Sequence, residues 1–109
     1  MIVAREKLPM RREAESFALR FAGVSDPFVV TLGRFSDGRL AEVFIDAGKR
    51  GQLFDDLARD IAVLISLALQ HGVPIGTLAR ALTRDARGVA HGLAGAVLDA
   101  IADGEAAPP

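Results

Sequence analysis

Two basic residues between glycines form the most suggestive site in the sequence. Gly48-Lys49-Arg50-Gly51 follows a strand-like stretch and precedes an amphipathic helix. Unpaired main-chain N–H groups and the positive end of the helix dipole favour anions at such a place. The loop is therefore a candidate site for a phosphate, a nucleotide or a nucleic-acid backbone. The alternative is a glycine-bracketed turn with solvated charges, since the glycine spacing and the residue after the lysine do not fit a Walker motif.

Four more basic residues make up a second candidate, a ligand loop of Arg34, Arg39, Arg87 and His91. Arg34 and Arg39 could form a basic patch with Arg11 and Arg12 if the lead-in runs beside the sheet edge. His91 lies in a polar loop that could close over a ligand. Ordinary surface charge, offset by neighbouring acidic residues, is the alternative for the arginines. A lone histidine without a placed partner is weak support for catalysis.

Most other site chemistry is excluded by the residue types. The chain has no cysteine and only two histidines, so it has no disulfide, no thiolate metal site and no thiol redox chemistry. No serine–histidine–aspartate order, carboxylate pair or metal-ligand spacing stands out. We therefore expect no catalytic residue, no bound metal and no cofactor.

Length and composition indicate one globular domain. The chain has 109 residues, half of them hydrophobic and a quarter charged, with a net charge of −1, so no overall basic field attracts nucleic acid. We expect a basic lead-in at residues 1–12, one domain at 13–103 and a disordered tail at 104–109. The N-terminus lacks the apolar run of a signal peptide, and the longest apolar run is too short to span a membrane. We expect a cytoplasmic protein.

Three segments have the alternation of half-buried strands. They are predicted at residues 16–21, 28–35 and 40–46, with Phe28, Val30 and Leu32 on one face of the second. Ser-Asp-Gly at residues 36–38 predicts a tight turn, because glycine supplies the positive φ that hairpin turns need. Short connections between sequential strands predict an antiparallel meander.

The pattern changes to that of a helix at residue 52. The longest helix, at about 52–71, is predicted from apolar residues at three- and four-residue spacing. We expect these to face inward: Leu53, Leu57, Ile61, Leu64, Ile65 and Ala68. The second half of this helix is apolar almost all round, so we expect it at the buried centre of the fold. Gly72 and Pro74 end it, and His71 is expected to cap it.

Two shorter helices are predicted at residues 75–83 and 93–102, joined by a polar loop. Strands followed by helices indicate an α+β fold. We expect a three-stranded antiparallel sheet with three helices packed on one face.

Several short motifs follow one another along the chain in a recognisable order. They are GRF at 33–35, DGR at 37–39, EVFI at 42–45, GK at 48–49 and SLALQHG at 66–72. They resemble the TSCPD domain, a small module at the C-terminal end of vitamin B12-dependent (adenosylcobalamin) ribonucleotide reductases. The chain is most similar to the short stand-alone bacterial members. Their LPxRR opening resembles residues 8–12, and their DxxG loop and GxxGxxLD segment resemble residues 85–88 and 92–99.

The chain departs from the family in one informative way. The Thr-Ser-Cys-Pro-Asp motif that names the domain is absent, and so is every cysteine. In family members attached to reductases, such cysteines suit metal binding or a thiol relay. Ribonucleotide reduction needs a thiyl radical and a reducing cysteine pair, and the chain is too short for the barrel that holds them. We expect no such catalysis by this chain alone, and the name ribonucleoside-diphosphate reductase would reach it only through similarity to the family.

Two functions of different class remain. The first is a non-catalytic accessory or binding module that acts through the basic loop or a partner surface and binds a nucleotide, a phosphate, a nucleic acid or a reductase. The second is an interaction protein that forms a homodimer or larger oligomer through the open sheet face, where Ala18, Val29, Thr31 and Phe44 are expected. Neither involves a membrane.

Overall fold

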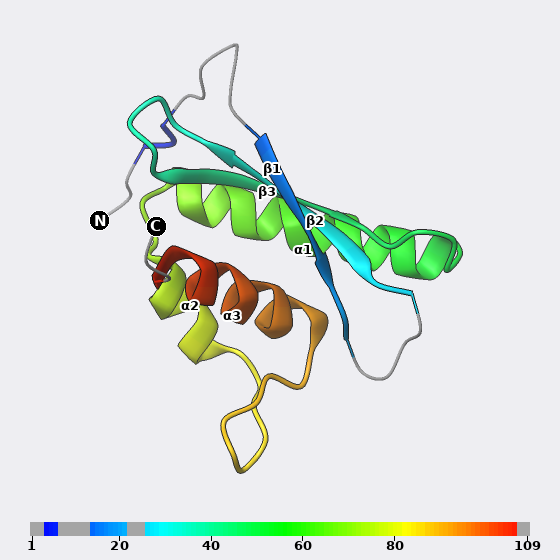
Figure 1. The fold of residues 1–109 in the computed structure, drawn as a ribbon. Coiled ribbons are helices and arrows are strands. Elements are labelled where there is room, and N and C mark those ends of the chain that lie inside the picture. The colour runs from blue at the N-terminus through cyan, green and yellow to red at the C-terminus, as the bar shows by residue number, and fades with distance from the viewer. Residues whose placement is uncertain (1–3, 7–13, 22–25, 107–109) are drawn as a thin grey trace. The chain divides into compact units, whose positions relative to one another are not determined.

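The computed structural model describes residues 4–6, 14–21 and 26–106. Within them, three antiparallel strands precede three helices, which confirms the α+β fold (Figure 1). The elements are β1 (Ala14–Leu19), β2 (Phe28–Arg34), β3 (Leu40–Asp46), α1 (Gln52–Gln70), α2 (Ile75–Ala81) and α3 (Leu93–Ala106). The chain divides into two compact units, Met1–Val73 and Pro74–Pro109. No helix in the described ranges is long and apolar enough to cross a membrane.

The sheet of the first unit is the predicted meander, in the order β1-β2-β3. β2 lies between two antiparallel neighbours, so β3 is an edge strand. The turn between β2 and β3 is closed by the Phe35 N–H, which donates to the Arg39 carbonyl, and Gly38 adopts a φ of 92° in it. Glycine tolerates this left-handed conformation because it has no Cβ.

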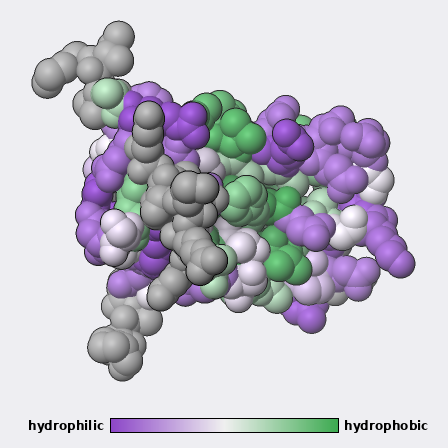
Figure 2. All heavy atoms as spheres, turned by 90° about the horizontal axis from the view of Figure 1, so that it is seen from above, coloured by the Kyte–Doolittle hydropathy of each residue, from purple (hydrophilic) through white to green (hydrophobic). Residues whose placement is uncertain are grey.

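The two faces of the sheet differ sharply in exposure. Phe28, Val30 and Val43 are almost completely buried on one face. On the other face Val29 is 42% exposed and Phe44 53% exposed, as the predicted open face requires. Figure 2, seen from above the sheet of Figure 1, shows apolar areas separated by hydrophilic ones. The sheet is thus half covered, which is ordinary for an antiparallel meander.

Helix α1 runs along β3 and packs mainly on that strand (Figure 1). It ends as predicted: Gly72 has a φ of 84°, and the Nδ1 of His71 lies 2.8 Å from the Leu67 carbonyl oxygen. His71 therefore caps the helix.

The predicted inward stripe of α1 is wrong at three positions. Leu53 and Leu64 are each 68% exposed and Leu57 is also exposed, so the second half of the helix is not buried all round. The residues that are buried instead lie at neighbouring positions: Ala58, Ala62, Ile65, Leu69 and Gln70. Two of these are alanines, because a small side chain lets the helix lie close to the strand. The periodicity predicted the helix but not which side of it faces the sheet, because apolar residues lie on more than one side of the helix.

The second unit holds α2 and α3, which pack on each other. Between them, Arg84 forms a two-pronged ion pair with Asp99, with N–O distances of 2.7 and 2.8 Å. The pair lowers the pKa of Asp99 and raises that of Arg84, chiefly through the side-chain hydrogen bonds. α3 continues to Ala106, past the expected start of the tail, because one glycine at 104 weakens a helix without breaking it. Residues 107–109 and most of the lead-in lie outside the described residues.

Candidate functional site

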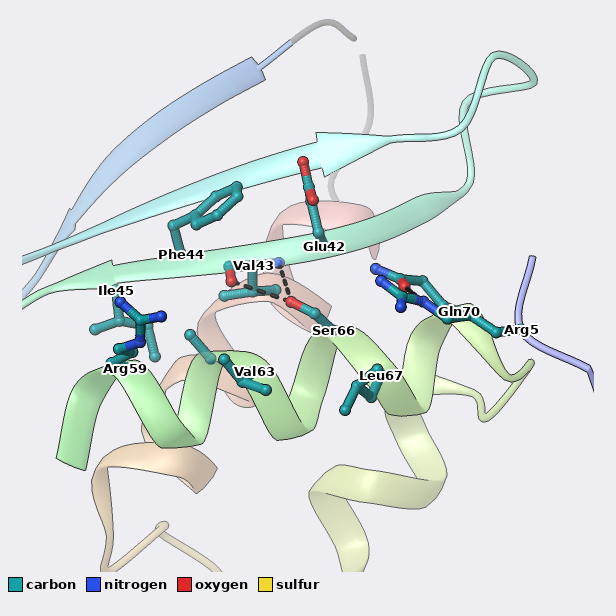
Figure 3. A pocket seen from close by; sticks show the side chains of 11 residues that line it. Arg5, Glu42, Val43, Phe44, Ile45, Arg59, Val63, Ser66, Leu67 and Gln70 are labelled. Carbon is teal, nitrogen blue, oxygen red and sulfur yellow. Dashed lines mark hydrogen bonds between the residues drawn. The ribbon is translucent and has the colours of Figure 1, made fainter. Parts of the chain in front are cut away.

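A groove opens between β3 and α1 in the first unit (Figure 3). Its volume is about 350 Å³, which lies in the range of small-ligand sites. Apolar side chains from both elements line it, together with five polar or charged ones: Arg5, Glu42, Arg59, Ser66 and Gln70. A concave surface with a few converging polar groups is the usual form of a binding site.

Two polar residues of α1 reach the edge of β3. The hydroxyl of Ser66 accepts from the Val43 N–H at 2.8 Å and donates to the Val43 carbonyl at 3.1 Å. The side-chain amide of Gln70 donates to the Ala41 carbonyl at 3.0 Å. These bonds satisfy main-chain groups that an edge strand would otherwise leave open.

The two arginines of the groove differ in their contacts. Arg5 donates to the side-chain oxygen of Gln70, and the adjacent Glu6 N–H donates to the Gln70 main-chain carbonyl at 2.8 Å. Arg59 forms no ion pair or hydrogen bond with any residue in the described ranges. Figure 3 shows Arg59 beside Ile45, at the end of the groove away from Arg5. Arg59 is therefore the charge available to a ligand.

Glu42 forms the rim of the groove on the open-face side of β3 and is 9% exposed. Its side chain crosses Gly33 of β2, where an added Cβ would lie 2.6 Å from the Glu42 Cγ. The glycine is required there by close approach rather than by its own conformation. The carboxylate is thereby held against the sheet.

The predicted anion loop, residues 48–51, has part of its charge turned inward. Arg50 donates to the carbonyls of Ala47 and Asp26, and its guanidinium lies 4.1 Å from the centre of the Phe28 ring. Lys49 is exposed, and Gly51 precedes the helix with a φ of 95° and no side-chain cap. One lysine and the uncapped helix start therefore remain for an anion.

The arginines of the predicted ligand loop in the first unit also have partners. Arg34 bonds Glu15 at 2.5 Å, and Arg39 bonds both Glu6 and Asp37 at 2.8 and 2.7 Å. Hydrogen bonds from the Arg39 main chain and side chain lower the pKa of Asp37. Hydrogen bonds to the carboxylates of Glu6 and Asp37 in turn raise the pKa of Arg39. Both arginines are engaged as surface ion pairs.

The other two members of that loop, Arg87 and His91, belong to the second unit. Arg87 is exposed and only 4.0 Å from Asp85, while the His91 N–H donates to the Thr83 carbonyl. Their loop is a turn built around Asp85, whose carboxylate accepts from the main chain of residues 87 and 89. Asp85 of the DxxG motif therefore shapes this turn, and Asp99 of the GxxGxxLD motif pairs with Arg84.

No group of three or more histidine, aspartate or glutamate residues that could hold a metal occurs in the described part of the chain. The sequence prediction concentrated on charged loops and missed the groove. A signal was present: Ser66 and Gln70 interrupt the apolar half of the helix at four-residue spacing, which puts both on one face. Nothing in the sequence indicated that this face meets a strand edge.

Comparison with known proteins gives a consistent set of similarities. The family model described as TSCPD domain matches residues 5–104. A vitamin B12-dependent ribonucleotide reductase of Agrobacterium fabrum is 39% identical over 79 residues, which are 72% of this chain and 6% of that protein. The reductase of Bradyrhizobium diazoefficiens is 35% identical over 79 residues, with the same shares. A third, from Rhodopirellula baltica, is 32% identical over 71 residues, 65% of this chain and 7% of that protein.

The matched region is a small part of each relative. The chain spans about 6% of the length of the first two reductases. No solved structure matches the chain.

Proposed function

Because the chain belongs to the TSCPD domain family, we propose that it is a non-catalytic binding module whose ligand binds in the groove between β3 and α1. The resemblance read from the short motifs is confirmed by the family match. The chain has no cysteine and corresponds to a small part of its reductase relatives, which supports binding rather than catalysis. A reductase is one partner to test.

The observation that carries this proposal is the state of Arg59. Most charged side chains discussed above are held by neighbours, whereas Arg59 lies in a concave site without an ion pair to any described residue. Arg59 is exposed at the end of the groove, and a guanidinium without an ion pair beside apolar walls favours a carboxylate or phosphate ligand. The groove therefore offers one charge for affinity and apolar surface for burial.

A fragment screen by amide NMR tests the site without presuming the ligand. Fragments that carry a carboxylate or a phosphate should shift the amide signals of Ile45, Ser66 and Gln70. Arg59→Gln should lower the affinity of these fragments about tenfold. Arg80→Gln is the matched control, since Arg80 is exposed on α2 and its loss removes an equal charge outside both the groove and the basic loop. Hits spread over the surface, or none in the groove, would contradict the proposal.

The basic loop at residues 48–51 is a second site for the same function. The uncapped start of α1 and the exposed Lys49 favour a nucleotide, a phosphate or a nucleic-acid backbone there. Shifts confined to amides 48–52 with ADP or inorganic phosphate, removed by Lys49→Gln, would select this loop over the groove.

Self-association through the open sheet face is the alternative function. Its specific support is the exposure of Val29 and Phe44 on neighbouring strands of that face. Light scattering at micromolar concentration decides it: a dimer lost in Phe44→Ser supports the alternative, and a strict monomer removes it.

A further inference from the structure

Helix α1 has a second apolar side besides the one that packs on the sheet. It consists of five residues that lie within about 80° of one another around the helix axis and are called the leucine stripe below: Leu53, Leu57, Ile61, Leu64 and Ala68. The stripe lies about 110° around the axis from the side on which Ala58 and Ala62 are buried. Arg59 and Ser66, which line the groove, lie on the opposite flank of the helix. The leucine stripe is therefore a surface separate from the groove.

Much of the leucine stripe is exposed. Leu53 and Leu64 are each 68% exposed, Leu57 is 49% exposed, and Phe54 beside them is 41% exposed. These four side chains together expose on the order of 400 Å², since a large apolar side chain has about 150–250 Å² to bury. The largest apolar patch on a typical monomer is about 300–600 Å² and often has a function. The stripe thus has the size of an interaction surface.

The exposed area also fits a pair of identical chains. Two copies joined through the stripe would bury about 800 Å² of apolar surface, and polar side chains at the rim would bring the total to about 1,200 Å². This total is at the lower end of the range for specific protein–protein interfaces, where weak and transient complexes are found. A dimer of micromolar affinity is therefore expected.

The charges of α1 determine how two copies can pair. All of them lie in its first half, at Asp55, Asp56, Arg59 and Asp60, and residues 61–70 carry none. A parallel pair would place the acidic half of one helix beside the acidic half of the other. An antiparallel pair places each acidic half beside an uncharged half, and it also brings opposite ends of the two helix dipoles together. The charge pattern therefore suits a second copy in the antiparallel direction.

We propose that the leucine stripe docks on the same stripe of a second copy of this chain, with the two α1 helices antiparallel. Such a two-fold interface uses one surface twice and must be self-complementary. The stripe runs from residue 53 to residue 68, so complete overlap places the two-fold axis between residues 60 and 61. Leu57 then packs on Leu64 of the partner subunit, and the large Leu53 meets the small side chain of Ala68 of the partner subunit.

This dimer accounts for the apolar pattern of α1. The leucine stripe has the spacing of a buried helix side, although the fold of one chain leaves it largely open. A second copy buries it. Because the groove lies on the opposite flank of α1, the dimer leaves both grooves open and does not depend on their ligand.

Disulfide cross-linking tests the pairing and its direction, because the natural chain has no cysteine. Under mild oxidation, an equimolar mixture of the Leu57→Cys and Leu64→Cys variants should form a mixed disulfide, since these positions face each other across the interface. Either variant alone should cross-link at least about tenfold more slowly, because its two thiols are about 10 Å apart along the helix axis. Phe44→Cys, on the open sheet face, is the control for random collision.

Substitutions in and beside the stripe should change the dissociation constant of the dimer in both directions. Leu64→Ser should raise it at least about tenfold, whereas Phe44→Ser should leave it within about twofold. Asp60→Asn should lower it about twofold to threefold, because the register brings the two Asp60 carboxylates close to the two-fold axis. Sedimentation velocity at about 1–100 μM measures the constant. Urea unfolding checks that each variant is folded.

Four outcomes would overturn the proposal. They are a wild-type chain that is monomeric at about 100 μM, a dimer unaffected by Leu64→Ser, faster cross-linking of either cysteine variant alone than of the mixture, and a dimer lost in Phe44→Ser. The last would assign self-association to the open sheet face instead. If Leu64→Ser fails to fold, Asp60→Asn decides, since an unchanged or weaker dimer in that variant would also overturn the proposal.

Discussion

The basic loop at residues 48–51 and the groove between β3 and α1 invite opposite expectations. The loop is conspicuous in the sequence, yet Arg50 is committed to two carbonyls and an aromatic ring of its own fold. The groove is inconspicuous, yet it combines apolar walls with an exposed arginine that has no ion-pair partner among the described residues. A charged side chain that stands out in the sequence can be bonded within the fold, as Arg50 is. A binding site needs polar groups that the fold leaves without partners.

The largest expected effect is on stability, and it distinguishes Arg50 of the loop from Arg59 of the groove. Arg50→Ala removes charged hydrogen bonds to two main-chain carbonyls and a cation–π contact, so we expect the free energy of unfolding to fall by about 2–3 kcal/mol. Urea unfolding followed by circular dichroism measures it. A loss below about 0.5 kcal/mol would show that Arg50 is free to bind ligands, and the contrast with the groove would fail.

The next largest effect on the free energy of unfolding is expected where Glu42 crosses Gly33 at the rim of the groove. Gly33→Ala places a Cβ 2.6 Å from the Glu42 Cγ, so β3 or the glutamate must shift, at a cost of about 1–2 kcal/mol. Combining Gly33→Ala with Glu42→Ala should cost less than the sum of the single changes, because the clash is then absent. Strict additivity in urea unfolding would contradict the close approach.

Much of the fold could be predicted from the sequence, for reasons visible in particular residues. Alternation at Phe28, Val30 and Leu32 identified a strand with one buried face, and Gly72 marked the end of α1. These signals are local, because strand and helix periods and positive φ depend on a few neighbouring residues. The order of three strands and three helices followed directly.

The orientation of α1 and the groove could not be predicted in this way. Leu64 and Ile65 are both apolar, and only contact with β3 decides that Ile65 is buried while Leu64 is exposed. The groove depends on how α1 lies along the edge of β3, which is a tertiary relation. The sequence also made Arg50 a candidate anion ligand, because it could not reveal the contact of Arg50 with the carbonyl of Asp26, 24 residues away in the chain.

A smaller, pH-dependent effect is expected in the second unit. Arg84 holds the pKa of Asp99 below its usual range, mainly through side-chain hydrogen bonds. The resulting stability is fully present above the unfolded pKa of about 3.9 and is lost as pH falls through the lower folded value. Asp99→Asn should therefore be less stable than wild type at pH 7, and the difference should shrink below pH of about 4. A difference that grows in acid would contradict the ion pair.

The smallest expected effect on stability belongs to the groove itself. Arg59→Gln should change the free energy of unfolding by less than about 0.5 kcal/mol, because no described residue pairs with Arg59. Urea unfolding beside Arg50→Ala makes the measurement a matched pair. A large loss would mean that Arg59 has a structural partner, and the groove would lose its available charge.

Hydrogen exchange at the edge of β3 tests the central claim most directly. In the free chain the Val43 amide, bonded to Ser66, should be protected, whereas the Ile45 amide should exchange rapidly. A carboxylate or phosphate fragment bound in the groove should slow exchange at Ile45. An Ile45 amide as protected as that of Val43 in the free chain, and unchanged by fragments, would show that Ile45 does not line an open site, and the account of the groove would be wrong.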